Sequence, residues 1–432
     1  MAPDDGPDGR QGRLTDTIFA LSSGAPPAAI AVVRISGPRA DAALIALAGR
    51  LPEPRRATLA ALRRDGELLD RALVLRFPGP GSATGEDLIE LHLHGGRAVV
   101  AAVQAALGAL PGLRAAQPGE FTRRAFENGR IDLAESEGLA DLLQAETESQ
   151  RRAAMALAGG ALSRQVETWR IALLALAARV EASLDFSDEA DVAPDDFRAA
   201  FAGMADRIEA WLGRPSAERL RDGVRVAVAG PPNIGKSSLI NALSERDVAI
   251  TSAIAGTTRD LIEAPVAIGG TPFVLIDTAG LRTSEDEIEA IGVARARDAV
   301  ARADIVLWLG APAESPADAI RIHAKCDLSP PPPGVDLAIS SLTGEGLDRL
   351  AHLLVERAAT LLPVEGEVAL HARHRAALAD AAAWLREGEV AADPLISAES
   401  LRQALRALDR VTGRAGVEDM LDALFGRFCI GK

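Results

Sequence analysis

An eight-residue phosphate-binding pattern at residues 230–237 constrains the fold of this 432-residue chain more than any other feature. It reads GPPNIGKS, follows the apolar run VRVAVA directly, and precedes the apolar-periodic run SSLINAL. A buried strand, a glycine-rich loop and a helix in this order place backbone amides and a helix N-terminus around phosphate oxygens. The pattern therefore predicts an α/β nucleotide-binding domain, in which Lys236 neutralises phosphate charge and the Ser237 hydroxyl joins a Mg²⁺ shell.

Lysine is scarce in the chain, which makes the lysine of this loop informative. Only Lys236, Lys325 and Lys432 occur among 47 basic residues. A lysine retained against so strong a preference for arginine is a candidate for a role that needs a compact ammonium group. Lys236 is in the position where such a group is required.

Three further motifs follow in the order that a guanine-nucleotide site requires. AGTTRD at 255–260 supplies Thr258 to cap Mg²⁺, and DTAG at 277–280 ends an apolar strand and places a carboxylate near the metal. AKCD at 324–327 and SSL at 340–342 end two later strands and form a base pocket, which favours GTP over ATP. The nucleotide contacts expected from these motifs are Asn233, Ile234, Gly235, Lys236, Ser237, Ser238, Ala255, Gly256, Thr258, Asp277, Thr278, Ala279, Gly280, Lys325, Asp327, Ser340, Ser341 and Leu342.

Two positions depart from the usual GTPase pattern. Ala324 stands where such motifs usually carry asparagine, so we expect weaker binding with the guanine preference kept by Asp327. Leu281 follows DTAG, where Ras-like enzymes carry the glutamine that positions water. Asn233 could instead ligate a monovalent cation, although a turn-favouring asparagine is the simpler interpretation. Glu289 is the other catalytic candidate, in an acidic run of a kind that is usually solvated.

The chain is long enough for about three domains. Short apolar strands mixed with helical runs predict an α+β domain near the N-terminus, and a proline-free stretch predicts long antiparallel helices that weaken at Gly159-Gly160. The fold class is thus multidomain α/β and α+β, with a helical bundle and an inserted Ras-like P-loop domain whose sheet is mostly parallel. The expected segments are a flexible tail at 1–13, the α+β domain at 14–120, the helical domain at 121–218 and 361–432, and the inserted domain at 219–360.

Composition excludes several classes of protein. A formal net charge of −14 argues against a general nucleic-acid coat protein, and 3% aromatic residues argue against a base-stacking platform. Two cysteines, Cys326 and Cys429, cannot form a disulfide framework, which suits a reducing compartment. The acidic start is unlike a signal peptide, and no long uncharged apolar run is present, so we expect a cytoplasmic protein without a membrane span.

Glu90, His92 and His94 alternate on one face of a predicted strand. Two histidines and a glutamate could bind zinc, but no further ligand cluster lies nearby, so a polar face lining a cofactor pocket is the preferred interpretation. Arg34 ends another apolar strand, where it is either a surface cation or a partner for a carboxylate. Cys429 is either a functional thiol on a tail or a small buried apolar residue.

The chain resembles the MnmE (TrmE) family of bacterial tRNA-uridine-modification GTPases. The resemblance covers nearly all of the chain, and its specific segments are QPGEFTRRAFENGRIDLAE, GEDLIELHLHGG and the C-terminal FCIGK, with GPPNIGKSSLINAL, AGTTRD and DTAGLR in the nucleotide-binding domain.

The resemblance implies a set of ligands and site residues. The N-terminal domain would be folate-binding-like, would dimerise, and would bind 5-formyl- or methylene-tetrahydrofolate through Arg34, Glu90 and Arg130. The G domain would need K⁺, and Glu289 would be catalytic. Cys429 matches a tRNA-modification position. K⁺ ligands would be Asn233, Ser252, Ile254 and Thr257, Mg²⁺ ligands Ser237 and Thr258, and further nucleotide contacts Ser252, Ala253, Ile254 and Thr257.

The activity implied is GTP hydrolysis coupled to a 5-carboxymethylaminomethyl-type modification of the wobble uridine of certain tRNAs. The implied assembly is a homodimer with an FAD-dependent MnmG-like partner, in a heterotetramer or larger complex. A ribosome-assembly GTPase is an alternative, but it would need an appended basic domain, which the sequence lacks. A GTP-gated scaffold with little turnover is another, and Leu281 keeps it open.

Overall fold

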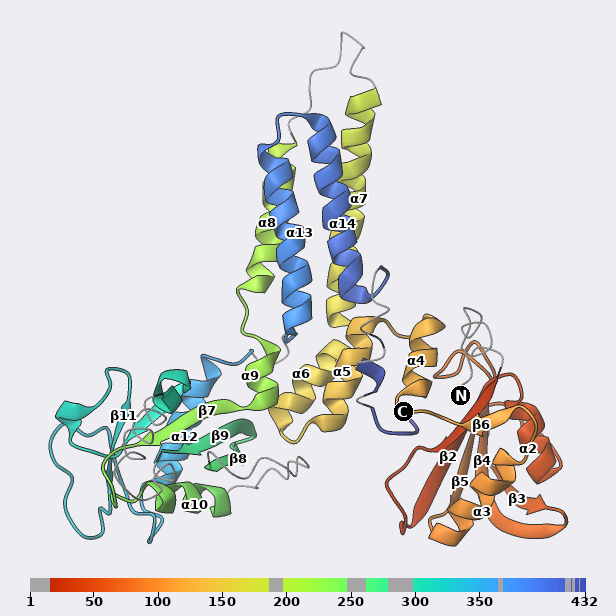
Figure 1. The fold of residues 1–432 in the computed structure, drawn as a ribbon, viewed down its shortest axis with the longest axis horizontal. Helices are drawn as coiled ribbons and strands as arrows, with labels where there is room; N and C mark the ends of the chain where they lie inside the picture. Colours follow the sequence, from red (N-terminus) through yellow and green to blue (C-terminus); the bar gives the residue numbers. More distant parts are fainter. Residues whose placement is uncertain are drawn as a thin grey trace, which may run out of the picture. The chain divides into compact units, whose positions relative to one another are not determined.

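The computed structural model describes residues 16–185, 197–246, 262–278, 298–363, 368–415, 421, 424–426 and 428–432. The expected tail at 1–13 lies outside them. The chain forms two compact units, residues 1–140 with 412–432 and residues 141–411, and the elements of each are labelled in Figure 1. No helix among the described residues is long and apolar enough to cross a membrane.

The first unit is built on a sheet of six described strands in the order β3-β4-β5-β2-β1-β6. The strands pair antiparallel, except that β6 runs parallel to β1. This mixed arrangement with helices confirms the predicted α+β class. The elements are β1 (Thr17–Leu21), β2 (Ile30–Ser36), α2 (Ala40–Ala48), β3 (Thr58–Arg64), β4 (Glu67–Phe77), β5 (Leu88–His94), α3 (Arg97–Gly108), β6 (Leu113–Ala115) and α4 (Glu120–Glu127).

One face of this sheet carries the core of the domain. Val33 of β2 and Leu91 of β5 are fully buried in a cluster with Leu44 of α2 and Val103 of α3. Period-2 alternation sends the intervening residues of the same strands to the other face. That second face holds Arg34 and Glu90, together with Ile30, which is exposed.

The C-terminal segment packs within the same unit. Phe425 and Phe428 form a small cluster with Leu133, and Ile430 forms an antiparallel bridge with Pro118. Gly119 adopts a left-handed φ of 69°, and an added Cβ there would lie 2.2 Å from the Phe425 carbonyl oxygen. The end of the chain is thus part of the N-terminal fold.

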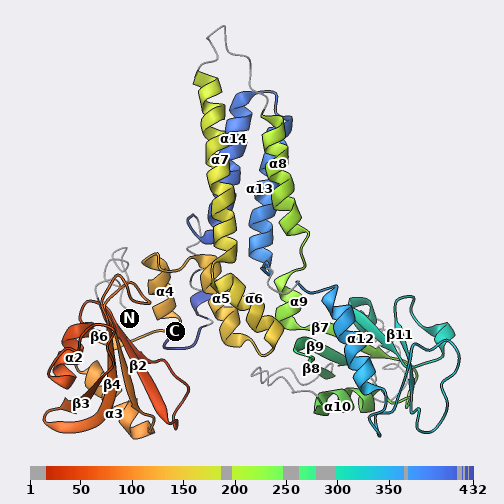
Figure 2. The ribbon, with the colours of Figure 1, turned by 180° about the vertical axis from the view of Figure 1, so that it is seen from behind.

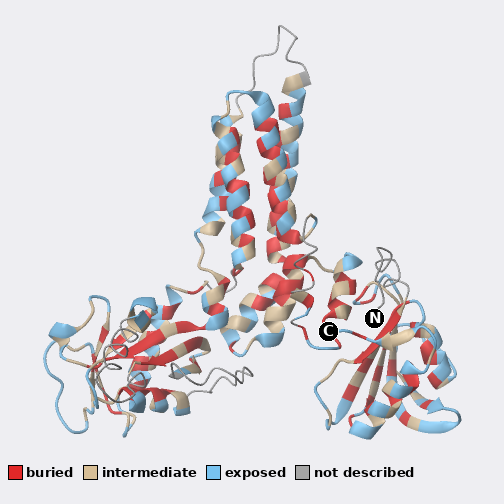
Figure 3. Ribbon diagram, viewed as in Figure 1, coloured by how far each residue is buried: buried red, intermediate tan, exposed pale blue. Residues whose placement is uncertain are grey.

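The second unit contains the predicted long helices. A break falls at Gly159-Gly160, where one helix ends and the next begins. Four of the helices run side by side in both Figure 1 and Figure 2. Figure 3 shows buried and exposed faces alternating along them, as expected for amphipathic helices around a shared core. The helices are α6 (Glu148–Ala158), α7 (Ala161–Asp185), α8 (Arg198–Leu212), α13 (Ala372–Val390) and α14 (Pro394–Thr412), of which α7, α8, α13 and α14 form the bundle. Helix α5 (Leu133–Gln144) begins in the first unit and ends in the second.

The P-loop domain is inserted between α8 and α13, and its sheet has six described strands in the order β12-β11-β10-β7-β9-β8. Among these strands β8 runs antiparallel to β9 and the others pair in parallel, which confirms the predicted mostly parallel sheet. Its elements are α9 (Ala217–Asp222), β7 (Val224–Ala229), α10 (Lys236–Arg246), β8 (Ile262–Ile268), β9 (Thr271–Asp277), β10 (Ile305–Trp308), β11 (Ile320–Ala324), β12 (Leu337–Ile339) and α12 (Leu347–Ala359).

Candidate functional site

The phosphate-binding loop connects β7 to α10 at the carboxyl edge of the parallel strands. Parallel sheets bind ligands at this edge, where strand order reverses around the first strand. Gly230 has a φ of 142°, and an added Cβ would lie 2.9 Å from the backbone of Leu309. Asn233 and Gly235 also have positive φ, at 59° and 114°. The backbone path therefore depends on residues that tolerate the left-handed region.

Lys236 begins α10 with its side chain folded against the loop. Only 5% of the residue is exposed, and its ammonium group donates to the carbonyl oxygens of Gly230 at 2.9 Å and Pro231 at 2.7 Å. A compact group with three donors suits this enclosed position better than a planar guanidinium. The geometry holds a positive charge at the mouth of the loop.

Ser237 and Asp277 come together from different parts of the chain. The Ser237 hydroxyl donates to the Asp277 carboxylate at 2.5 Å, and Asp277 is 3% exposed at the end of β9. Pairing of Val228 with Asp277 aligns the ends of β7 and β9 and produces this contact. Hydroxyl and carboxylate oxygens are ligands that Mg²⁺ accepts, so the pair fits a site for this ion. Thr278 donates to the Val228 carbonyl at 2.8 Å and ties the end of β9 to β7.

The base-binding motifs meet at the ends of β11 and β12. The Cys326 amide donates to the Ile339 carbonyl at 3.0 Å, which ties AKCD to the segment containing buried Ser340. Lys325 reaches the phosphate loop and donates to the Asn233 carbonyl at 3.1 Å. Asp327 is exposed and can accept hydrogen bonds from a ligand. Burial, with nearby Glu345, raises the pKa of the Cys326 thiol, which therefore stays protonated.

The other predicted residues of this region differ in how the structure places them. Ile234 is half-buried and Ser238 is exposed in the first turn of α10, while Ser341 and Leu342 follow β12 and Leu342 is largely exposed. Several predicted positions lie outside the described residues: Ser252, Ala253, Ile254, Ala255, Gly256, Thr257, Thr258, Ala279, Gly280, Leu281 and Glu289.

A second polar group lies on the open face of the N-terminal sheet. Arg34 and Glu90 are register partners on β2 and β5, and the Arg34 Nε donates to the Glu90 carboxylate at 2.9 Å. The imidazole of His92 lies 3.4 Å from the other Glu90 oxygen. A guanidinium and a carboxylate on this open sheet face match the carboxylate and amide groups of a folate, so the donor set fits such a ligand.

Arg130 lies close to the start of β5, although no direct contact joins it to Glu90. Its amide donates to the Ala125 carbonyl at 2.8 Å just beyond α4, and its side chain lies near Gly85. Gly85 precedes β5 by three positions, and the exposed Arg130 is thus available beside the polar face. Its predicted grouping with Arg34 and Glu90 stays a prediction.

Asp70 is a residue of this region that the sequence reasoning missed. Its carboxylate binds His94 through both the backbone amide, at 2.9 Å, and the imidazole Nδ1, at 2.7 Å. The available signal was its strand phase, because Asp70 alternates with buried Ala72 and Val74. A carboxylate in the buried phase of a strand needs a partner. No cluster of three or more potential metal ligands occurs in the described part of the chain.

Cys429 is exposed near the end of the first unit. Its carbonyl accepts from the amides of Gly119 at 3.4 Å and Lys432 at 3.2 Å, so the backbone around it is held while the thiol faces solvent. Its exposure contradicts the interpretation as a small buried apolar residue, and a functional role of the thiol stays a prediction.

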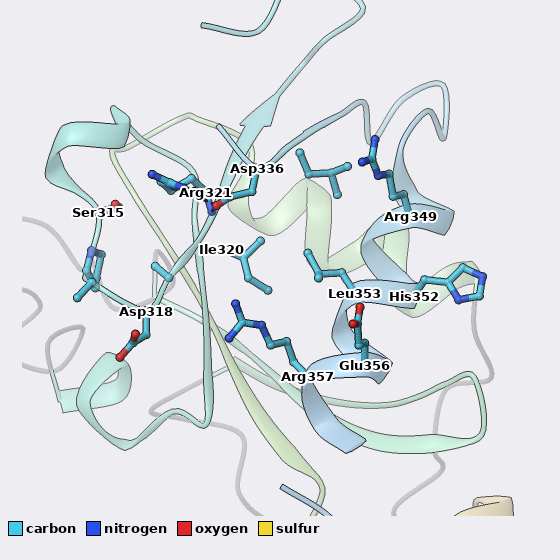
Figure 4. A pocket seen from close by; sticks show the side chains of 14 residues that line it. Ser315, Asp318, Ile320, Arg321, Asp336, Arg349, His352, Leu353, Glu356 and Arg357 are labelled. Atoms are coloured by element: carbon cyan, nitrogen blue, oxygen red, sulfur yellow. Dashed lines mark hydrogen bonds and ion pairs between the residues drawn. The ribbon is translucent and has the colours of Figure 1, made fainter. Parts of the chain in front are cut away.

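A cavity of about 620 Å³ lies in the P-loop domain away from these motifs. Ile320 and Leu337 are at its floor, at the amino ends of β11 and β12, opposite to the phosphate loop. Figure 4 shows the paired Arg321 and Asp336 at its rim and Arg357 of α12 reaching toward it. Its Arg321 and Asp336 pair with each other, and the phosphate-binding loop lies at the other edge of the sheet.

Comparisons with known proteins cover almost all of the chain. Two family models match, described as the MnmE helical domain over residues 133–429 and the GTP-binding protein TrmE N-terminus over residues 17–130. The tRNA modification GTPase MnmE of Rhizorhabdus wittichii is 62% identical over 97% of this chain and 97% of its own. That of Erythrobacter litoralis is 59% identical over 96% of this chain and 100% of its own.

Among solved structures, the G domain of the T. maritima FeoB iron transporter aligns with 31% of this chain and 98% of its own, at 27% identity and a TM-score of 0.23. So low a score adds nothing to the assignment. The family models and the two relatives agree with the phosphate loop, the helical bundle and the N-terminal sheet described above. This chain belongs to the MnmE (TrmE) family.

Proposed function

We propose that this chain is a GTP hydrolase that acts in tRNA modification. The observation that carries the proposal is the hydrogen bond between Ser237 and Asp277 beside Lys236, an arrangement that fits a phosphate and metal site. The two relatives that align with this chain over nearly their whole length are named tRNA modification GTPases. In this role the loop amides bind the phosphates, Lys236 neutralises their charge, and Asp327 selects guanine. Mg²⁺, when bound at Ser237 and Thr258, supplies charge neutralisation at the β- and γ-phosphates.

Potassium is the second part of the proposal. Leu281 has no group that can position water, so the residues that complete the site are Glu289 as the catalytic residue and Asn233, Ser252, Ile254 and Thr257 as K⁺ ligands. Asn233 is exposed in the loop, so its side-chain oxygen is accessible to a cation. K⁺ bound there supplies positive charge next to the phosphates. The G domains of two chains then meet during hydrolysis.

The N-terminal sheet is proposed as the folate site. Arg34, Glu90 and Arg130 would hold 5-formyl- or methylene-tetrahydrofolate, and the exposed Cys429 would take part in the modification. When bound, the folate would supply a one-carbon unit for the modification. The substrate proposed is the wobble uridine of certain tRNAs, modified in the cytoplasm together with an FAD-dependent MnmG-like protein bound to the homodimer.

The test is GTP turnover by the purified chain in K⁺ and in Na⁺ at equal ionic strength. We expect faster hydrolysis in K⁺, and equal rates would remove K⁺ from the mechanism. Absence of turnover in a single-turnover assay, with GTP bound, would replace the enzyme with a GTP-gated scaffold. Mass spectrometry of wobble uridines from cells lacking the protein tests the tRNA substrate, and unchanged uridines would overturn it.

Glu289→Ala separates binding from chemistry. A residue that only activates water contributes to the transition state, so we expect turnover to fall by about 100-fold with GTP affinity nearly intact. The matched control is the neighbouring acidic residue Glu287→Ala, which should leave turnover within about twofold. Unchanged turnover in Glu289→Ala would exclude it as the catalytic residue.

A further inference from the structure

The first turn of α6 is held by an amide side chain that forms hydrogen bonds in two directions. Thr147 is the N-cap of this helix, and Gln150 completes a capping box with it. The Gln150 side-chain oxygen accepts from the amides of Glu146 at 2.9 Å and Thr147 at 3.0 Å. Its Nε2 donates to the carbonyl oxygens of Leu220 at 3.1 Å and Arg221 at 3.3 Å, in the last turn of α9, which lies beside α6 in Figure 1 and Figure 2. One side chain therefore caps the start of α6 and the end of α9.

A glutamine rather than a glutamate at this position points to the second of these roles. Both side chains can complete a capping box, and the carboxylate of a glutamate would also interact favourably with the positive end of the helix dipole. An ionised carboxylate only accepts hydrogen bonds, so it would leave the α9 carbonyls without a donor. Gln150 thus carries the group that the contact with α9 needs.

The neighbouring residue, Ser149, holds a second segment of the P-loop domain. Its amide donates to the Gly270 carbonyl at 3.3 Å, and its hydroxyl donates to the same oxygen at 3.0 Å. Gly269 and Gly270 form the turn between β8 and β9, and both have positive φ, at 57° and 77°. Because the first amides of a helix have no partner within it, this turn supplies an acceptor that α6 lacks. Ala153, one turn further along α6, packs against the core of the same domain.

Both contacted segments lead directly to the nucleotide site. α9 is followed by β7 and the phosphate-binding loop, and β9 ends at Asp277, which accepts from Ser237. β7 and β9 pair in parallel, from Val224 with Phe273 to Val228 with Asp277. The first turn of α6 therefore contacts the chain at the amino edge of these two strands. The metal-site pair lies at their carboxyl edge, about 13 Å further along at about 3.3 Å per residue.

We propose that Ser149 and Gln150 are positioning residues for the metal–nucleotide site, and that they couple occupancy of this site to the docking of α6. The inference rests on the proposed function and adds the route by which the nucleotide state reaches the helical domain. Holding α9 and the β8–β9 turn on one helical turn restrains the shift of β7 and β9 along each other. The contact between Ser237 and Asp277 depends on that alignment. By linkage, docking of α6 favours Mg²⁺–nucleotide binding by the same factor as binding favours docking.

Gln150→Glu removes the contact with α9 and keeps the helix. The variant retains the acceptor for the Thr147 amide and places a negative charge at a helix N-terminus, so α6 should stay folded. It sets a carboxylate against two carbonyl oxygens that have lost their donor. In titrations with a fluorescent GDP analogue, affinity in Mg²⁺ should fall roughly 3- to 10-fold, and affinity in EDTA should change by less than about twofold. Gln165→Glu, the same exchange in α7, is the matched control and should change neither affinity.

Ser149 provides an independent test of the second contact. Ser149→Ala removes the hydroxyl bond to Gly270 and should weaken binding in Mg²⁺ by roughly 2- to 5-fold, whereas Ser149→Thr keeps a hydroxyl and should stay closer to wild type. Unchanged affinity in Mg²⁺ in both Gln150→Glu and Ser149→Ala would overturn the inference. Equal losses in Mg²⁺ and EDTA would also overturn it, because they would indicate a general effect on the fold of the P-loop domain.

Hydrogen exchange measures the coupling without a variant. The Ser149 amide exchanges only when its bond to Gly270 opens. Mg²⁺–GDP should slow exchange in residues 146–150 relative to GDP in EDTA, and unchanged exchange would overturn the coupling. If wild type binds no guanine nucleotide in either buffer, the proposed function fails and the inference fails with it. Nucleotide binding that shows none of these responses keeps the proposed function and removes the inference alone.

Discussion

Lys236 is one of three lysines in the chain, and its side chain is enclosed by the phosphate-binding loop. Its ammonium group is enclosed by the loop and donates to two loop carbonyls. A guanidinium has the same charge, but its planar shape and extra length do not fit a 5% exposed position. Lys236→Arg should therefore weaken guanine-nucleotide binding by at least about 10-fold, measured by titration with a fluorescent GDP analogue.

The control for this substitution is Lys325→Arg in the same site. Lys325 is exposed and spans to the Asn233 carbonyl, so arginine has room there and should cost less affinity. A comparable loss of nucleotide affinity in the two variants would show that the shape of the ammonium group is not the reason for a lysine at position 236. Circular dichroism of both variants checks that the fold is kept.

At this scale, residues with a motif were predictable, including Ser237 and Asp277 at a shared metal site, and long-range partners without a motif were not. GPPNIGKS and DTAG identified Ser237 and Asp277, because each motif has its own backbone context. Their 2.5 Å contact joins residues 40 positions apart and follows from strand pairing. Asp70 has no motif, and only the pairing of β4 with β5 brings it to His94. Strand order, which local patterns do not encode, decided what each carboxylate would meet.

Among the elements, α8 and α13 pack closely through a glycine. Gly388 is in α13, and an added Cβ would lie 2.2 Å from the ring of Phe201, which is fully buried in α8. Alanine has a helix propensity about 1 kcal/mol better than glycine, but the clash requires the helices to separate. Gly388→Ala should lower the free energy of unfolding by about 1–3 kcal/mol in urea denaturation.

Gly203 provides a matched control in the partner helix. It lies within α8, and an added Cβ meets nothing within 4 Å. Gly203→Ala should therefore raise the free energy of unfolding by up to about 1 kcal/mol. If both substitutions stabilise, the close approach of α8 and α13 at Phe201 is not maintained in solution.

A buried ion network stabilises the junction of β1, α4 and β6. The Arg124 side chain is 3% exposed and donates to Asp16, Glu86 and Glu120. Burial raises the pKa of Glu120, but hydrogen bonds from Arg114 and the Gln117 amide, with the charges of Arg114 and Arg124, outweigh it and lower the value. Glu120 is therefore ionised at neutral pH.

The lowered pKa of Glu120 gives its contribution a definite pH dependence. A carboxyl group with a pKa below its unfolded value, about 4.3, stabilises the fold above that value and loses this contribution as pH falls through the folded pKa. Glu120→Gln should cost about 1–3 kcal/mol of unfolding free energy at pH 7 and much less at about pH 3. Urea titrations of the first unit at the two pH values measure this, and a loss independent of pH would assign the effect to packing.

The periodicity of apolar residues predicted where helices and strands lie better than it predicted which strands pair. The break at Gly159-Gly160 and the strand at β2 follow from local propensity, and both are present. The three-residue β6 and the arginine-containing β3 depend on neighbouring strands for pairing, which local propensity does not encode. The 220–358 run of apolar strands was recognisable because strands of a parallel sheet are buried on both faces.

At the scale of the whole chain, the P-loop domain enters and leaves the helical bundle at one point. Ser216, before α9, forms a parallel bridge with Leu370, before α13. The Ala217 amide donates to the Leu370 carbonyl at 3.1 Å, and the Ala372 amide donates to the Glu218 carboxylate at 2.7 Å. Adjacent chain crossings allow a domain to be inserted without interrupting the packing of its host.

This geometry predicts that the bundle folds without the inserted domain. Bridged backbones are about 5 Å apart, so replacing residues 217–369 with about six glycine and serine residues should leave the packing of α7, α8, α13 and α14 unstrained. The bundle helices are held together by the ring contact of Trp169 with Trp211 and the ion pair of Arg170 with Asp409, and all four residues are retained.

The shortened chain should keep its helical circular dichroism and a cooperative melt while losing nucleotide binding. The full-length Lys236→Arg variant is the control, because it weakens nucleotide binding without shortening the chain. Loss of cooperative melting in the shortened chain alone would mean that the bundle depends on contacts with α9 and β9.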